Sequence, residues 1–481
     1  MVRPEIRSGY RVTIGIECHV QLKTKTKLFS AVGNDAREAP ANTLISHIDL
    51  GMPGALPVLN EAAVVLASRA AFALGTKPQP FSKFDRKHYF YPDLPNGYQI
   101  TQFYDPIIKG GVVTFDVAGE QRQVRIHEAH LEADAGKSTH PVGRDYSLVD
   151  LNRAGTPLLE IVSEPDIHSS EDARAYAREL YLLVRYADVS DASLYYGNMR
   201  FDVNVSVSKT DELGTRTETK NLNSFRSVEK AAEYEIDRQI ALLESGEAVV
   251  QETRGWDDSK QETFSQRGKE EAHDYRYMPD PDLPPIVLSD DMIAEFQKSM
   301  PLLPNIYRDV LKHLGLDLAT IETLIDSPAN TKLVKNVLDE SDAQHAKRVA
   351  NWLVNVSTED DDDSQQSDNR VSAEAAIKLS KMVSDNKLSS TSAKEIWQEI
   401  LVQGGDPEAL AQSKNLLQVS DQGEIASIVQ AVLAENPKAA EDIKNGEMKA
   451  IGFLVGQVMK QSKGKANPTL AQAVIKAQLG L

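Results

Sequence analysis

The stretch that decides the fold is Ile14-Gly15-Ile16-Glu17-Cys18-His19-Val20-Gln21-Leu22, near the start of the chain. Its apolar residues occupy the even positions and its polar residues the odd positions, which is the period-two pattern of a strand with one buried face. Glu17 and His19 share the polar face, about 6.6 Å apart at a rise of about 3.3 Å per residue. Two side chains at this spacing are close enough to share one ion.

Three further segments, 129–134, 201–207 and 215–220, repeat the alternation. Each predicts a strand with an ionisable or polar face. If these strands neighbour one another in an antiparallel sheet, their carboxylates converge on one concave polar surface. The polar faces carry His130, Glu132 and Asp134; Asp202, Asn204 and Ser206; and Arg216, Glu218 and Lys220.

An ordinary solvated sheet face is the alternative interpretation, because a one-sided sheet exposes polar residues to water in any case. Asp and Glu are poor strand formers, however. Four acid-bearing strands therefore make a metal-binding or phosphate-handling site about as well supported as a solvated face. Carboxylate oxygens with one imidazole suit a hard cation such as Mg²⁺ or Mn²⁺ rather than a structural zinc. Such ions usually accompany nucleotide phosphates.

The composition bounds the class of protein. A chain of 481 residues is long enough for two to four domains. With 53 basic and 71 acidic residues, its net charge of −18 excludes nucleic-acid binding through overall charge, so any such binding needs a local patch. The single cysteine, Cys18, excludes an internal disulfide framework and is expected in the core. No secretory signal or membrane-spanning stretch is recognisable, so we expect a cytoplasmic protein without a membrane partner.

The order of patterns along the chain predicts an α+β domain followed by helical domains. Up to about residue 290, short strands mix with helices expected at 60–74, from Ser169 onward and at 227–243. After Ser289 the patterns are helical, interrupted by an acidic run that begins at Glu359. A last helical unit of about 70 residues follows Pro407, with amphipathic pieces at 424–434 and 470–478.

The end of the chain is locally basic, with six lysines against one acidic residue between 443 and 481. Lysines that contact phosphates are the usual source of salt-dependent RNA affinity. Ordinary solubilising lysines are the alternative, and charge alone favours it. No familiar nucleotide-binding or kinase motif is present. The residues by themselves therefore predict metal-dependent phosphate or carboxylate chemistry on an unidentified substrate.

Long motifs extend this interpretation over nearly the whole chain. They lie at residues 15–22, 54–60, 84–95, 147–155, 160–166, 220–225, 273–277, 452–457 and 463–468. With these motifs the chain resembles the B subunits of aspartyl/glutamyl-tRNA amidotransferases.

The resemblance implies a subunit that amidates Glu carried on tRNA(Gln), Asp carried on tRNA(Asn), or both. The side-chain carboxylate would be phosphorylated with ATP and Mg²⁺, and ammonia would then displace phosphate. Ammonia would come from glutamine through a partner amidase, the A subunit, in a heterotrimer with a small C subunit. The domains would be a mixed or antiparallel-sheet cradle at 1–295, a helical domain at 296–406 with a flexible acidic loop at 359–370, and a helical tail at 407–481 that contacts tRNA.

Residue by residue, the family motifs assign six residues to metal binding and phosphoryl transfer. Alternation alone selects all of them except Glu160, whose surroundings alternate only weakly. Nearby polar and cationic residues are expected to hold ATP phosphates or the tRNA terminus, although for each cation pairing with neighbouring acids is equally well supported. Four tail lysines are expected to contact tRNA. The three sets are Glu17, His19, Glu132, Glu160, Asp202 and Glu218; Arg86, Lys87, Arg200, Asn204 and Lys220; and Lys449, Lys460, Lys463 and Lys465.

The chain departs from the resemblance at one place. Many similar proteins carry four zinc-binding cysteines where this chain has Ser30, Val32, Ser46 and Asp49. We therefore expect no structural zinc here, and a loop held by packing or hydrogen bonds. A second function class also remains open, namely a non-catalytic tRNA-binding scaffold. Clustered acids argue against it, because a passive RNA platform would not place carboxylates where phosphates must come.

Overall fold

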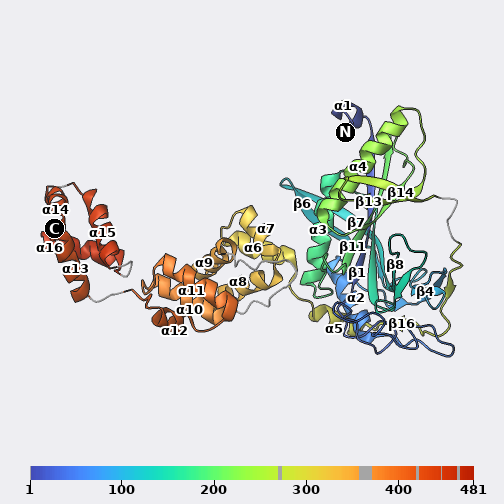
Figure 1. Ribbon diagram of the computed structural model, residues 1–481, viewed down its shortest axis with the longest axis horizontal. Helices are drawn as coiled ribbons and strands as arrows, with labels where there is room; N and C mark the ends of the chain where they lie inside the picture. Colours follow the sequence, from blue (N-terminus) through green and yellow to red (C-terminus); the bar gives the residue numbers. More distant parts are fainter. Residues whose placement is uncertain (1, 269–273, 357–370, 419–421, 446, 463–465) are drawn as a thin grey trace. The chain divides into compact units, whose positions relative to one another are not determined.

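The computed structural model describes the chain except for residues 1, 269–273, 357–370, 419–421, 446 and 463–465. The chain forms two compact units, Met1–Pro304 and Asn305–Leu481 (Figure 1). The first unit combines sheets with helices and the second is helical, so the predicted α+β class is confirmed. The three-domain division with borders at 295 and 406 stays a prediction, and the acidic loop 359–370 lies outside the described residues.

The first unit is built on one large sheet, in which nine strands are described. Its neighbours pair antiparallel, except that β12 and β13 run parallel. In spatial order the strands are β14 (Glu262–Gly268), β13 (Glu252–Asp257), β12 (Thr217–Leu222), β11 (Met199–Ser208), β1 (Arg11–Gln21), β10 (Pro157–Ser163), β7 (Glu120–Ala133) and β5 (Ile108–Lys109), with β6 (Val112–Val117) also paired to β7.

The apolar face of this sheet is covered by helices α3 (Ser170–Tyr186) and α4 (Phe225–Glu244), which pack on each other and over β6 and β11 (Figure 1). The even-numbered residues of β1 from Ile14 to Val20, including Cys18, are buried in the same core as the apolar stripe of α3. Ser169 and Ser224 cap the two helices, since each side chain accepts a backbone N–H of the first turn. Because side chains alternate along β1, its odd-numbered side chains lie on the opposite face of the sheet.

Among the described residues of the first unit, three small sheets and three further helices complete the fold. Asn60 caps α2 (Glu61–Ala73), as its sequence pattern predicts, and Gly75 follows the helix with a φ of 74°. The sheets pair β15 (Met278–Pro279), β3 (Asp85–His88) and β4 (Tyr98–Thr101); β16 (Ile286–Val287) and β2 (Phe81–Ser82); and β8 (Lys137–Thr139) and β9 (Leu148–Asp150). The helices are α1 (Pro4–Arg7), α2 (Glu61–Ala73) and α5 (Asp290–Lys298).

The second unit is a series of short helices, most of which begin with a Ser, Asp or Asn cap. Trp352 and Trp397 pack in its interior with ring centroids 5.2 Å apart, and α13 to α16 share a separate apolar core. The helices are α6 (Pro304–His313), α7 (Leu318–Ile325), α8 (Pro328–Glu340), α9 (Ala343–Asn355), α10 (Ala373–Ser384), α11 (Ser390–Gln403), α12 (Pro407–Ser413), α13 (Gln422–Glu435), α14 (Pro437–Lys444), α15 (Ala450–Gln461) and α16 (Pro468–Leu479).

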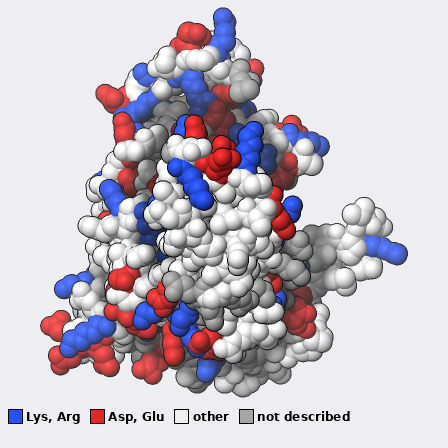
Figure 2. All heavy atoms as spheres, turned by 90° about the vertical axis from the view of Figure 1, so that its left-hand side faces the viewer, with Lys and Arg blue, Asp and Glu red and all other residues white. Residues whose placement is uncertain are grey.

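Two observations bear on whether the chain could bind a membrane or RNA. Within the described part of the chain, no helix combines the length and apolar character needed to cross a bilayer. On the face drawn in Figure 2, Lys and Arg side chains are interspersed with Asp and Glu rather than gathered into one basic area. This mixture agrees with the expectation that any RNA contact depends on a local patch.

Candidate functional site

The strand register places the predicted acidic residues on one face of the large sheet. Glu17 lies opposite Asp202 on β11, and His19 lies opposite Glu160 on β10 and Arg200 on β11. One strand further out, Glu160 faces His130 on β7, and Asn204 faces Glu218 on β12. Directly opposed residues point to the same side of a sheet. Five neighbouring strands thus gather all six residues predicted to bind metal and transfer phosphoryl groups.

One group on this face consists of His19, Glu132 and Glu160, which we call the histidine group. Its possible ligand atoms lie within 4.8 Å of one another. His19 Nδ1 is 3.6 Å from Glu132 Oε1 and 3.9 Å from Glu160 Oε2, and this buried nitrogen has no hydrogen-bond partner. A buried polar atom without a partner is costly. Two carboxylates and an imidazole nitrogen are suitable ligands for a divalent cation, and such an ion would give the His19 nitrogen the partner that it lacks.

A second group consists of Glu17, Asp202 and Glu218, which we call the carboxylate group. Lys220 already balances part of its charge, because Nζ lies 2.8 Å from Asp202 Oδ2 and 2.6 Å from Glu218 Oε1. Asn204 Nδ2 donates to Glu17 Oε1 at 3.0 Å. His19 Nε2 lies 3.6 Å from Asp202 Oδ2 and so connects the two groups.

The acidic face is less open than alternation alone suggests. The Glu132 and Asp202 side chains are only 6% and 3% exposed. Residues of the small β3–β4 sheet contribute to this enclosure, since β4 packs beside β7 and the Lys87 ammonium interacts with Glu132 and Glu160. The sequence pattern does not predict this enclosure, because the covering residues come from a separate segment of the chain.

Burial and mutual interaction shift the titration of these groups. Burial alone would lower the pKa of His19, but the nearby carboxylates of Glu160, Asp202 and Glu132 hold it well above its ordinary value. Burial would raise the pKa of Asp202, but the nearby His19 imidazole and the charge of Lys220 hold it below its usual range. The pKa of Glu17 is raised, first by burial and then by the charge of Glu160. In this arrangement the acids are balanced by nearby cationic groups.

Sequence reasoning did not include His130 among the site residues. Its Nε2 lies 3.3 Å from Glu160 Oε2, and its Nδ1 lies 3.7 Å from Glu128 Oε1. Burial alone would lower the pKa of His130, but Glu160 and Glu128 raise it to about 10. The signal was present, because His130 shares the parity of Glu132 in the alternating segment. What the sequence lacked was the register that places it against Glu160.

The predicted phosphate-binding cations divide into two sets. Lys87 and Arg200 face the acids: the charges of Glu132 and Glu160 act on Lys87, and Arg200 Nη2 lies 3.4 Å from Asp134 Oδ1. Arg86 is instead held by Asp280 and Asp282, each at 2.8 Å, and its guanidinium lies 4.2 Å from the centroid of the Tyr98 ring. Successive residues of a strand point to opposite sides. Arg86 thus pairs with neighbouring acids, as Arg200 and Lys220 also do, and its phosphate-binding role stays a prediction.

Two family models match the chain over most of its length. A model described as the GatB/GatE catalytic domain matches residues 12–294, which include every residue of both acidic groups. A second model, described as a GatB domain, matches residues 332–479. The chain belongs to the GatB/GatE family.

Curated relatives in this family are named as the B subunit of aspartyl/glutamyl-tRNA(Asn/Gln) amidotransferase. The protein of Caldicellulosiruptor bescii is 43% identical over 480 residues, covering 98% of this chain and 99% of the relative. The protein of Alkalilimnicola ehrlichii is 45% identical over 476 residues, with the same coverage. That of Bdellovibrio bacteriovorus is 43% identical over 480 residues, again with 98% and 99% coverage.

The loop that carries Ser30, Ser46 and Asp49, where we expected no structural zinc, contains a buried polar cluster. Ser30 donates to the Asp49 carboxylate at 3.1 and 3.2 Å, and the backbone N–H of Ser46 donates to Asp49 Oδ2 at 2.8 Å. Lys27 Nζ lies 3.4 Å from Asp49 Oδ2 and donates to the carbonyl of Leu44 at 2.7 Å. Hydrogen bonds and an ion pair hold this loop at three of the four positions that would carry cysteines.

The tail lysines lie in the second unit. Lys449 precedes α15 and Lys460 lies in its last turn, so roughly 16 Å of helix separates them at about 1.5 Å per residue. Both are exposed. Lys463 and Lys465 lie outside the described residues.

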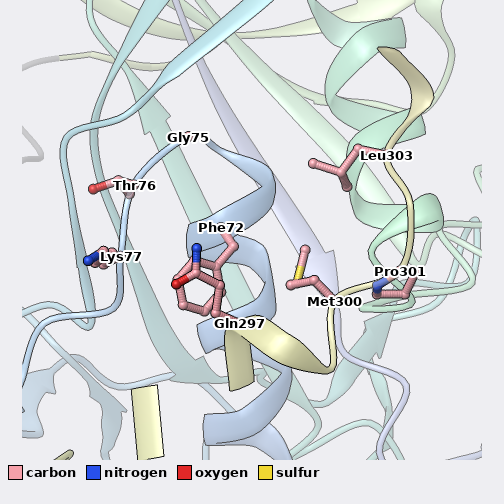
Figure 3. Close-up of a pocket in the computed structure, with 8 residues that line it drawn as sticks. All are labelled: Phe72, Gly75, Thr76, Lys77, Gln297, Met300, Pro301 and Leu303. Carbon is pink, nitrogen blue, oxygen red and sulfur yellow. The ribbon is translucent and has the colours of Figure 1, made fainter. Parts of the chain in front are cut away.

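A hollow of about 460 Å³ lies elsewhere in the first unit (Figure 3). It is lined by the end of α2, the turn at Gly75 and the segment that follows α5, including Phe72 and Met300. None of its lining residues was predicted as a site residue. None of them belongs to the histidine group or the carboxylate group.

Proposed function

We propose that this chain is the B subunit of a tRNA-dependent amidotransferase that converts Glu-tRNA(Gln), Asp-tRNA(Asn) or both to the amidated forms. The observation that carries the proposal is the convergence of six predicted residues from five neighbouring strands on one enclosed acidic face. This face lies wholly within the region matched by the catalytic-domain model.

The proposed reaction has two steps. First, a side-chain carboxylate oxygen of the aminoacyl group attacks the γ-phosphorus of ATP, and ADP leaves. Second, ammonia attacks the resulting acyl carbon, inorganic phosphate leaves, and the nitrogen loses a proton to give the amide. Phosphorylation is needed because oxide is a poor leaving group. Enclosure of the acidic face supports this chemistry, because water would hydrolyse the acyl phosphate.

Mg²⁺ is proposed to bind the histidine group, where the partnerless Nδ1 of His19 and the Glu132 and Glu160 carboxylates fit it. Bound there, the ion would supply charge neutralisation for nucleotide phosphates. The carboxylate group completes the proposed metal and phosphoryl-transfer site and holds Lys220 in place. Lys220, Lys87 and Arg200 then present cations to the ATP phosphates or the tRNA terminus, and Asn204 positions Glu17.

The proposed assembly is a heterotrimer in which the amidase, or A subunit, releases ammonia from glutamine, and a small C subunit is the third member. The tRNA would contact the second unit through Lys449 and Lys460, together with Lys463 and Lys465. As part of translation, the assembly is proposed to act in the cytoplasm. The alternative, a tRNA-binding scaffold without its own chemistry, is favoured only by the basic tail.

Amidation of misacylated tRNA by the purified assembly tests the proposal. His19→Ala and Glu160→Gln are expected to lower amidation by at least about 100-fold, while glutamine hydrolysis and tRNA affinity remain. Glu244→Gln is the matched control, because this acid pairs with Lys209 on the surface, outside both acidic groups. The scaffold alternative predicts the reverse: amidation would survive at the acidic face and fail with Lys449→Glu and Lys460→Glu.

A further inference from the structure

A β-bulge interrupts strand β12 directly beside the carboxylate group. Two residues of β12, Lys220 and Asn221, lie opposite a single residue of β11, Asp202, and the register shifts at this point. In a regular strand, residues two apart point to the same side, so Leu222 would share the acidic face with Lys220. Because of the bulge, Leu222 is buried in the core instead. Bulges are common next to active sites, where they redirect the backbone and its side chains.

Asn221 has a left-handed backbone within this bulge. Its φ is 60°, a conformation that residues with a Cβ rarely adopt and that Asn tolerates better than most. The residue itself is exposed. The chain is also fixed just beyond the bulge, because Ser224 caps α4. The left-handed conformation therefore sets the direction of the backbone at Asn221.

The two residues of the bulge each bind one oxygen of the Asp202 carboxylate. The backbone N–H of Asn221 donates to Oδ1 at 2.8 Å, and Lys220 Nζ donates to Oδ2 at 2.8 Å. His19 Nε2 lies 3.6 Å from the same Oδ2. With Oδ1 held by the backbone, the carboxylate is fixed so that Oδ2 lies toward the His19 ring.

The orientation of Asp202 bears on the orientation of His19. A carboxylate beside one nitrogen of a ligating imidazole fixes the ring and directs its other nitrogen to the metal. In His19 the other nitrogen is Nδ1, which lacks a hydrogen-bond partner. It lies 3.6 Å from Glu132 Oε1 and 3.9 Å from Glu160 Oε2.

We propose that Asn221 is a positioning residue for the divalent-cation site. Its left-handed backbone holds Asp202, and through Asp202 it holds the His19 ring in the orientation that binds the ion. This inference rests on the proposed function, since it takes the histidine group as the Mg²⁺ site. The alternative is that the exposed Asn221 side chain acts directly, by contacting a substrate or the ion.

The Mn²⁺ affinity of the purified assembly, measured by electron paramagnetic resonance without nucleotide, tests this proposal. Asn221→Val should weaken Mn²⁺ binding at least about tenfold, the loss expected when a group that orients a metal ligand is disturbed. Asn221→Gly should stay within about threefold of the wild type, because glycine adopts positive φ without strain. Asn386→Val is the matched control, because Asn386 has a φ of 55° and follows α10 in the second unit. It should leave the affinity unchanged.

A second variant covers the case in which Asn221→Val does not fold. Alanine has a Cβ but no branch, so it disfavours the left-handed conformation less strongly than valine does. The Mn²⁺ affinity of Asn221→Ala should therefore fall between those of the glycine and valine variants. Urea unfolding shows which variants are folded.

Wild-type Mn²⁺ affinity in the folded alanine and valine variants would overturn the proposal. So would an equal loss in Asn221→Gly, because the site would then need the side chain and not the backbone conformation. Absence of Mn²⁺ binding by the wild type would overturn it as well.

Transfer of labelled γ-phosphate to Glu-tRNA separates this inference from the proposed function. If the wild type transfers no phosphate but the variants keep the expected order of Mn²⁺ affinity, the proposed chemistry is wrong and the positioning role stands. If the wild type transfers phosphate and Asn221→Val binds Mn²⁺ as tightly as the wild type, the positioning role is wrong and the chemistry stands.

Discussion

Replacement of Lys27 by methionine is expected to lower the free energy of unfolding of the first unit by about 3–5 kcal/mol, the cost of removing one member of a buried ion pair. The Lys27 side chain is 0% exposed and that of Asp49 is 3% exposed. Burial lowers the pKa of Lys27, and Asp49 opposes that shift. Without the ammonium, the Asp49 charge stays buried with only the Ser30 hydroxyl and the Ser46 N–H as donors.

Urea unfolding of the full chain measures this loss, with hydrogen exchange of β1 amides as the readout for the first unit. Lys83→Met is the matched control, because Lys83 pairs with Asp105 at 3.1 Å on the surface, where about 1 kcal/mol or less is expected. Lys27→Met with Asp49→Leu should recover part of the loss, because neither buried charge remains. A loss for Lys27→Met no larger than that of the control would show that the buried Lys27–Asp49 pair contributes no more than an ordinary exposed pair.

Three further predictions concern metal, pH and the core. A zinc-selective chelator should leave the unfolding midpoint unchanged, and metal analysis showing stoichiometric zinc with a lowered midpoint after chelation would contradict this. Burial would raise the pKa of Glu235, but hydrogen bonds from Arg238 and Thr263 hold it below its ordinary value. The ionised Glu235 side chain therefore stabilises the fold fully above about pH 4.3, and this contribution is lost as the pH falls through the folded-state pKa. Glu235→Gln should therefore flatten the dependence of the midpoint on pH below about 4.3, and an unaltered slope would count against this. Cys18→Ser should cost about 1–3 kcal/mol in urea unfolding, because it buries a hydroxyl in an apolar core, while Cys18→Ala, the control, should cost less.

Local patterns predicted much of the first unit. Alternation identified β1, β11 and the end of β7, and the Asn60 cap predicted a helix at 60–74 that forms at Glu61–Ala73. The helix expected at 227–243 begins two residues earlier, at Phe225. These features depend on neighbours in sequence, which is why they can be predicted from it.

Other features depend on contacts between distant segments. The sequence could not give the register that sets His130 against Glu160, or the cover that buries Glu132 and Asp202. It also did not predict that Lys27 enters the loop that lacks cysteines, because an isolated lysine is normally exposed. The pairing of Arg86 with Asp280 and Asp282 was also beyond the sequence, because these acids lie almost 200 residues away along the chain.

Transfer of labelled γ-phosphate from ATP to Glu-tRNA by the purified assembly, with Mg²⁺ and without an ammonia source, tests most directly whether the acidic face transfers phosphoryl groups. Wild type and Asp202→Ala would be compared, with Glu244→Gln as the control. Labelled tRNA is expected with the wild type and the control, and none with Asp202→Ala. Equal labelling by all three proteins would contradict the assignment of phosphoryl transfer to the acidic face.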